Sequence, residues 1–159
     1  VSVGDADHIK TLLEQLGRVG FWKLAMRPGR PLAFGAIAGT PFFGLPGNPV
    51  SVAATWFQFV RPALRHLAGE AGVRRPRGFP ARTLAPLKKR PGRVEFQRGI
   101  LDYADDGTPV VDSTGEQGSG MLSSLANGNC FIVLPHDAGP IAAGELVEVQ
   151  PLYGVIDQP

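Results

Sequence analysis

Hydrophobic residues in the first third of the chain change from a helical spacing to a strand spacing. Over residues 5–16 they recur on one face of a helix, which Gly17 would end. Three short segments rich in β-branched and aromatic residues follow, and the pattern predicts strands over residues 19–24, 31–37 and 41–45. Because only a short Gly-containing turn separates the last two, we expect them to pair as a hairpin.

A helical spacing returns at Pro49 and continues to about Leu67. Asn48 is suited to cap this helix, and a proline in the first helical position loses no hydrogen bond. Pro62 falls inside the helix and predicts a kink or a local break. Gly69 should end it.

The second half of the chain has the pattern of a small β domain. Residues 73–80 have neither helical nor strand periodicity and indicate a linker. Strands are predicted over residues 82–88, 93–103, 109–112, 130–134 and 146–149, with a hairpin turn at Asp106-Gly107. We therefore expect one domain over residues 1–72 and a small β-barrel or sandwich over residues 81–159.

Composition narrows the class of protein further. The chain has 159 residues, of which 43% are hydrophobic and 19% charged, so it can bury a core. It has neither an apolar run long enough to span a membrane nor the pattern of a secretory signal, and a cytoplasmic protein is expected. The chain opens at Val1 with an apolar alternation, which suggests that it is part of a longer protein.

Cysteine content and charge disfavour several kinds of chemistry. Cys130 cannot form an internal disulfide, and the three histidines lack the spacing of a zinc site. The net charge is +2 and the pI about 9.0, with basic clusters at residues 74–77 and 88–90. These clusters could attract an anionic partner or could be solvated loops. They are not interleaved with aromatic residues, so a nucleic-acid surface is disfavoured.

The turn at residues 44–51 is the strongest local indication of a binding site. Pro46 and Pro49 fix the backbone on either side of Gly47, which lets another group approach closely. The free N–H groups at the start of the following helix, near Asn48 and Ser51, favour an anion. A tight turn with a capped helix also needs no ligand, so both interpretations stay open.

Cationic and acidic residues elsewhere could complete such a site. Lys23, Arg27 and Arg30 lie at a strand end and in the loop that leaves it, where ligands of α/β sheets usually bind. Asp5 and Asp7 stand at the expected start of the first helix, where they could bind Mg²⁺ or simply cap the helix.

The second half of the chain offers a further cation beside a glycine-rich turn. Arg98 and the Gly118-Ser119-Gly120 turn offer a bidentate cation, a hydroxyl and exposed amides, which suit a tetrahedral oxyanion. Taken separately, each could be ordinary surface.

Taken together and in order, these motifs resemble the molybdopterin molybdenumtransferases, including the gephyrin E domain. The matching segments are Val-Ser-Val-Gly-Asp-x-Asp, Phe-Trp-Lys-Leu-Ala-Met-Arg-Pro-Gly-Arg-Pro, Gly-Leu-Pro-Gly-Asn-Pro-Val-Ser, Phe-Gln-Arg-Gly and Gly-Asn-Cys-Phe-Ile-Val-Leu. The resemblance covers nearly the whole chain. It departs from the family pattern at Arg27 and Arg30, where many members have lysine, which keeps the charge but changes the donor geometry.

The resemblance implies an α/β fold: the second half of a molybdopterin-binding α/β sandwich domain, followed by a small C-terminal β-barrel domain. It implies an elongated four-domain homodimer that binds adenylylated molybdopterin and Mg²⁺, hydrolyses the adenylyl phosphate bond and inserts molybdenum from molybdate. This chain would supply only part of that enzyme and would be inactive alone.

The resemblance also assigns roles to individual residues. Asp7 would assist Mg²⁺ or nucleotide handling, and Lys23 and Arg27 would hold phosphate or molybdate. Arg98 and Ser119 would complete the molybdate site from the barrel. The cofactor-binding residues would be Asp5, Pro46, Gly47, Asn48, Pro49 and Ser51.

Two alternatives to a transferase remain. The fold could serve as a scaffold that recognises a partner without turnover, in which case a peptide-binding groove between the domains is expected. A nucleic-acid protein would rest only on the basic clusters and should show salt-dependent binding.

Overall fold

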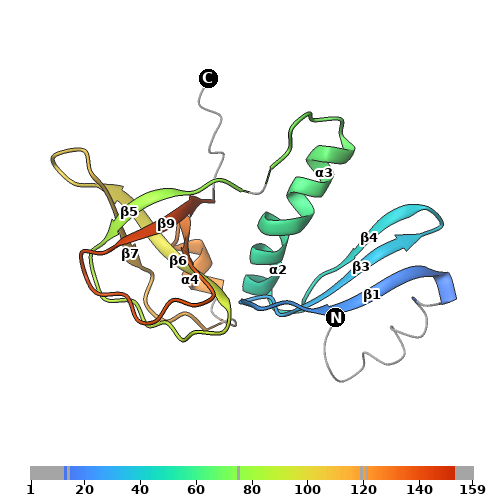
Figure 1. Cartoon of the computed structure of the whole chain (residues 1–159), viewed down its shortest axis with the longest axis horizontal. Helices are drawn as coiled ribbons and strands as arrows, with labels where there is room; N and C mark the ends of the chain where they lie inside the picture. Colours follow the sequence, from blue (N-terminus) through green and yellow to red (C-terminus); the bar gives the residue numbers. More distant parts are fainter. Residues whose placement is uncertain (1–12, 14, 75, 119, 121, 153–159) are drawn as a thin grey trace.

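A computed structural model describes residue 13 and residues 15–74, 76–118, 120 and 122–152 of the chain. It contains a three-stranded sheet, a helical segment and a strand-rich unit, joined as Figure 1 shows. Most of the helix predicted over residues 5–16 lies outside the described residues, and Leu13, Gln15 and Leu16 are helical.

The three predicted strands of the first half are confirmed. They are β1 (Gly17–Lys23), β3 (Pro31–Ile37) and β4 (Thr40–Gly44), and they form an antiparallel sheet in the order β1-β3-β4. The predicted hairpin joins β3 to β4 through Ala38 and Gly39, whose φ angles of 48° and 81° are typical of a type I′ turn. Leu13 packs on one face of this sheet against Val19 and Ala33.

The second predicted helix is also confirmed, together with its break. It consists of α2 (Pro49–Thr55), a π-helical turn η1 (Trp56–Val60) and α3 (Arg61–Leu67). The wide turn immediately precedes Pro62, whose ring cannot coexist with a regular hydrogen bond to the preceding turn. Gly69 ends the helix with a φ of 87°, and its N–H donates to the carbonyl of His66.

The strand-rich unit is a closed five-stranded barrel, as predicted. Its strands are β5 (Phe79–Thr83), β6 (Val94–Tyr103), β7 (Pro109–Ser113), β8 (Cys130–Leu134) and β9 (Leu146–Pro151). They follow the order β6-β7-β5-β9-β8, and β8 pairs back with β6 to close the ring. Apolar side chains such as Val111, Ile132 and Val149 are fully buried in its core.

Two details of the barrel differ from the sequence prediction. The strand expected over residues 82–88 is wrong in its bounds, because β5 spans Phe79–Thr83 and beyond it only Leu87 makes a bridge, to Ile141. Pro86 has no N–H to donate and so cannot continue a ladder. The short helix α4 (Leu122–Ala126) was not predicted.

The first half of the chain and the barrel share a core. The two-residue strand β2 (Met26–Arg27) belongs to the first half of the chain but pairs in parallel with β6 of the barrel. Met26 and Ala54 are buried with Phe96 and Phe131 of the barrel, and the Phe131 ring meets that of Phe57 edge-on at 6.1 Å. This shared core fixes the start of α2 relative to the barrel (Figure 1).

Candidate functional site

The turn before α2 has the geometry that its sequence predicts. The Asn48 side chain accepts a hydrogen bond from the N–H of Val50 (3.1 Å) and thereby caps the helix. Pro46 is buried, whereas Gly47 and Pro49 are exposed. Apart from its two chain neighbours, no described residue has an atom within 4 Å of the point where a Gly47 side chain would begin, so the described surroundings leave room for a ligand at this turn.

The loop after β2 is packed tightly on α2. Gly29 has a φ of 99°, and a Cβ there would stand 2.8 Å from the hydroxyl oxygen of Thr55. Glycine is therefore required where the loop approaches Thr55 of α2. The peptide bond between Arg27 and Pro28, just before Gly29, is cis. This packing places Arg27 where α2 meets the barrel, with 51% of its side chain exposed.

Arg98 of β6 is the most deeply buried cation of the described chain, with 1% of its surface exposed. Its Nε donates to the hydroxyl of Ser124 on α4 (2.9 Å), and its Nη2 donates to the carbonyls of Gly118 (3.0 Å) and Glu116 (3.4 Å). Among the residues that the structure describes, it forms no ion pair with a carboxylate. A buried guanidinium thus has only neutral partners here.

Two effects act on the charge of Arg98. Burial lowers the pKa of its guanidinium below the usual range, and the positive charge of Arg27 lowers that pKa further. A negative charge placed between the two arginines would favour the charged guanidinium of Arg98 and so offset both effects on its pKa.

The side chain of Gln117 holds the backbone of Arg98. Its Oε1 accepts from the Arg98 N–H (2.8 Å), and its Nε2 donates to the Arg98 carbonyl (3.1 Å). The loop after β7 is therefore held to β6 in two ways: the Gln117 side chain binds the Arg98 backbone, and the Arg98 side chain binds backbone carbonyls of the loop. The sequence analysis missed Gln117 and Ser124, because a lone glutamine or serine in a polar segment carries no distinctive pattern.

The turn before α2 and the loop that Arg98 holds meet at Gly120. The ideal Cβ position of Gly120 lies 4.0 Å from the side-chain nitrogen of Asn48. One place at the junction therefore combines the capped start of α2, a glycine-rich loop and the buried Arg98. Backbone amides and guanidinium groups in such an arrangement can bind an anion.

The remaining predicted site residues are distributed unevenly. Ser51 is buried in the first turn of α2, and Lys23 is exposed at the end of β1. Asp5, Asp7 and Ser119 lie outside the described residues. The described residues contain no group of three or more side chains able to ligate a metal.

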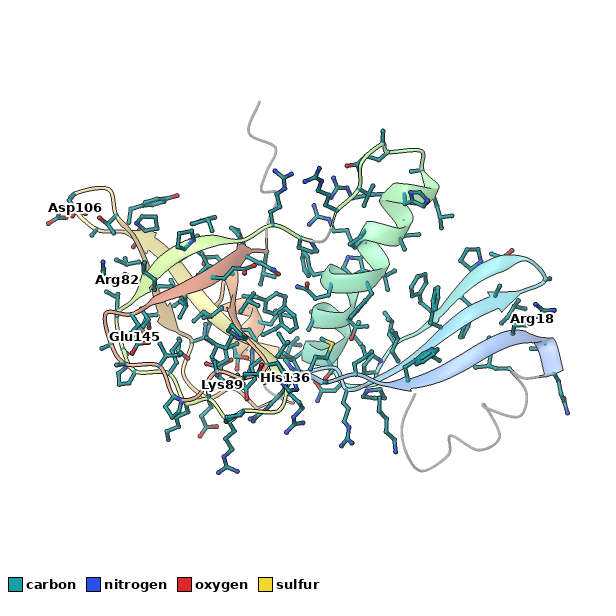
Figure 2. All side chains as sticks on the ribbon, in the orientation of Figure 1. Arg18, Arg82, Lys89, Asp106, His136 and Glu145 are labelled. Atoms are coloured by element: carbon teal, nitrogen blue, oxygen red, sulfur yellow. The ribbon has the colours of Figure 1, made fainter. Side chains whose placement is uncertain are left out.

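The predicted basic cluster at residues 88–90 lies in the loop before β6 of the barrel. Figure 2 labels Lys89 and His136 near one end of the barrel and Arg82 and Glu145 on its far side. Lys89 is buried, and its ammonium donates to the carbonyls of Arg90 and Arg93, so it supports the loop before β6. No helix of the described chain is both long and apolar enough to cross a membrane.

Comparisons with known proteins agree with the two halves of the chain. The family model of a probable molybdopterin-binding domain matches residues 1–66, and the model of the MoeA C-terminal region (domain IV) matches residues 80–152. A solved structure of a molybdopterin biosynthesis MoeA protein from Pyrococcus horikoshii superposes with a TM-score of 0.75 at 30% identity, over 94% of this chain and 36% of that one.

Relatives of known sequence are similar over most of the chain. A molybdopterin molybdenumtransferase from Haemophilus influenzae is 45% identical over 151 residues, which are 95% of this chain and 37% of that protein. A gephyrin from Dictyostelium discoideum is 33% identical over 93% of this chain and 24% of its own length. The chain therefore spans well under half the length of these relatives.

Proposed function

The chain belongs to the molybdopterin molybdenumtransferase family, whose C-terminal portion it matches, and on this premise we propose that it forms the oxyanion-binding part of an enzyme of molybdenum cofactor biosynthesis. The enzyme would transfer molybdenum from molybdate to adenylylated molybdopterin. Residues 1–72 would belong to the molybdopterin-binding domain, residues 73–80 to a linker and residues 81–159 to the barrel domain. The gap between the two matched family segments supports this division.

The buried guanidinium of Arg98 is the observation that carries the proposal. Folding has placed a cation among neutral partners, which costs free energy unless an anion compensates it. Molybdate is a tetrahedral dianion, and converging guanidinium groups, a hydroxyl and backbone N–H groups bind such ions well. Arg98 and Arg27 would supply the guanidinium groups, and Ser119 the hydroxyl.

The turn before α2 would hold the other substrate. Its exposed backbone at Gly47 and Pro49, the amide of Asn48 and the first helical turn with Ser51 would face the phosphates of adenylylated molybdopterin. Pro46 would keep the turn rigid, and Lys23 would neutralise phosphate charge from the end of β1. Asp5 would bind the same substrate.

Magnesium is part of the proposal only through residues beyond the described structure. Asp7 is the proposed ligand, and carboxylate oxygens suit this ion. The described residues contain no group of three or more His, Cys, Asp or Glu side chains that could hold a metal ion. At the junction they would bind and orient two anionic substrates.

Other properties of the whole enzyme follow the same premise. We propose that the full-length protein is a cytoplasmic homodimer and that the present chain does not turn over substrate alone. The relatives are longer than this chain by a factor of more than two, which supports the second point.

Molybdate binding by the chain itself tests the proposal. Isothermal titration with sodium molybdate should show one saturable site, and Arg27→Ala should weaken binding at least tenfold. Arg82→Ala, an arginine on the far side of the barrel (Figure 2), is the matched control and should bind within twofold of wild type. Equal binding by the Arg27 and Arg82 variants, or no saturable binding at all, would contradict the proposal.

A second candidate function is a partner-binding module without turnover. A cavity of about 530 Å³ opens between the linker and the β5 and β9 strands, lined in part by Arg74, Arg77, Phe79 and Leu146. Glu148 also lines the cavity. Arg74 and Arg77 would bind the carboxylates of an acidic peptide, and Phe79 and Leu146 would contact its large side chains. Saturable molybdate binding together with loss upon Arg27→Ala favours the first function, whereas binding of such a peptide without any molybdate binding favours the second.

A further inference from the structure

We propose that Glu95 is a positioning residue, which holds the guanidinium of Arg27 in the direction of the anion site. The inference rests on the proposed function, since it concerns how the same site is kept ready for an oxyanion. It is carried by the register of β2 with β6, by the hydrogen bonds that hold Glu95 and by one long ion pair.

The strand register places the two side chains on the same face. β2 and β6 run parallel, and Arg27 lies directly opposite Glu95. The Arg27 Nη1 stands 3.9 Å from the Glu95 Oε1. The Arg27 side chain is 51% exposed whereas that of Glu95 is 7% exposed, so the carboxylate is the fixed member of the pair.

Glu95 is fixed by contacts that do not involve Arg27. The Gln97 Nε2 donates to its Oε2 (3.0 Å) and also to the carbonyl of Lys88 (2.8 Å). The start of β6 is tied to β2 as well, because the Val94 N–H donates to the carbonyl of Ala25 (2.9 Å). The carboxylate therefore has a defined place in the protein before any anion arrives.

The separation of 3.9 Å decides what this pair can do. It lies beyond hydrogen-bond distance, so the guanidinium keeps its N–H donors for another acceptor. It is short enough for electrostatic attraction to restrict a long, half-exposed side chain that would otherwise sample many rotamers. The attraction also opposes the repulsion that Arg27 and Arg98 exert on each other.

The sign of one substitution separates positioning from a general charge effect. Glu95→Gln keeps the size of the side chain and removes one negative charge, which by itself would strengthen the binding of a dianion. Loss of positioning would instead weaken it. We expect Glu95→Gln to weaken molybdate binding at least fivefold, and Glu148→Gln, the same charge change at an exposed position of β9, to leave it within twofold of wild type.

A double substitution tests whether Glu95 acts through Arg27. If it does, adding Glu95→Gln to Arg27→Ala should weaken molybdate binding by less than a further twofold. Unchanged or tighter binding by Glu95→Gln alone, or a fivefold additional loss in the double variant, would overturn the inference.

A measurement without ligand separates this inference from the proposed function. Nitrogen-15 relaxation at the Arg27 Nε should report a more mobile guanidinium in Glu95→Gln than in wild type or Glu148→Gln. Unchanged mobility overturns the positioning of Arg27 even where molybdate binds. Absence of molybdate binding by wild type overturns the proposed function, and an increased mobility in Glu95→Gln still supports the pairing.

Discussion

Removing the side chain of Gln117 should loosen the strand segment that carries Arg98. In Gln117→Ala the Arg98 N–H loses its acceptor at 2.8 Å, while the Arg98 carbonyl keeps the N–H of Thr114 as a donor (3.1 Å). Arg98 is almost fully buried, so no water replaces the lost acceptor without local opening. Leaving a buried donor unsatisfied costs about 1–3 kcal/mol.

The effect should be visible at a single backbone amide. A loss of about 1–3 kcal/mol corresponds to roughly 5- to 140-fold faster hydrogen exchange at the Arg98 N–H if exchange follows opening of this segment. Exchange followed by NMR resolves this amide, and urea unfolding followed by circular dichroism gives the accompanying change in the free energy of unfolding.

Glu116→Ala is the matched control for this experiment. Glu116 lies in the same loop with an exposed side chain, and the structure uses only its backbone carbonyl to bind Arg98. Its substitution should change stability by less than about 0.5 kcal/mol. Equal exchange rates at the Arg98 amide in wild type and Gln117→Ala would refute the reasoning that this side chain satisfies a buried donor.

Three further predictions concern the helix cap, the buried thiol and the sheet. Asn48→Ala should lower the free energy of unfolding by about 1 kcal/mol because the cap of α2 is lost, whereas Asn127→Ala, at an exposed position, should change urea unfolding little. Burial raises the pKa of Cys130 to about 12, so the native thiol stays protonated at pH 9. It should therefore react with iodoacetamide far more slowly than the thiol of the unfolded chain, in which the thiolate forms near pH 9. Equal reaction rates of the native and unfolded chains would contradict this. Gly35→Ala should prevent the pairing of β1 with β3, since its Cβ would stand 1.9 Å from a β1 carbonyl oxygen. Gly47→Ala, whose Cβ meets no atom of the described residues beyond its chain neighbours, should fold; comparable yields and melting temperatures of the two variants would be the opposing result.

Much of the local structure could be predicted because its causes are local. A short apolar run between two turns specifies β3, and proline with a preceding asparagine specifies the start of α2. Pro62 predicts a break in the helix, and the structure has a π-helical turn just before it. Anion binding by the turn at residues 44–51 is a prediction from the same local features.

Only the tertiary structure decided how these pieces form one junction. β2 is two residues long and exists because it pairs with β6, which is about seventy residues later in the chain. Such a pairing has no local pattern. The same holds for α4, whose five residues are stabilised by packing and by the hydroxyl of Ser124 that Arg98 contacts.

The chemistry of the junction divides in the same way. The sequence by itself determined that arginines, glycines and a helix start were available, because residue type and turn geometry are local properties. Three features depend on β6 meeting segments from distant parts of the chain. Arg98 is buried and forms no ion pair with a carboxylate of the described residues, Gln117 binds the backbone of Arg98, and Arg27 pairs with Glu95. Burial and charge pairing arise from the surroundings that folding assembles, so only the tertiary structure decided them.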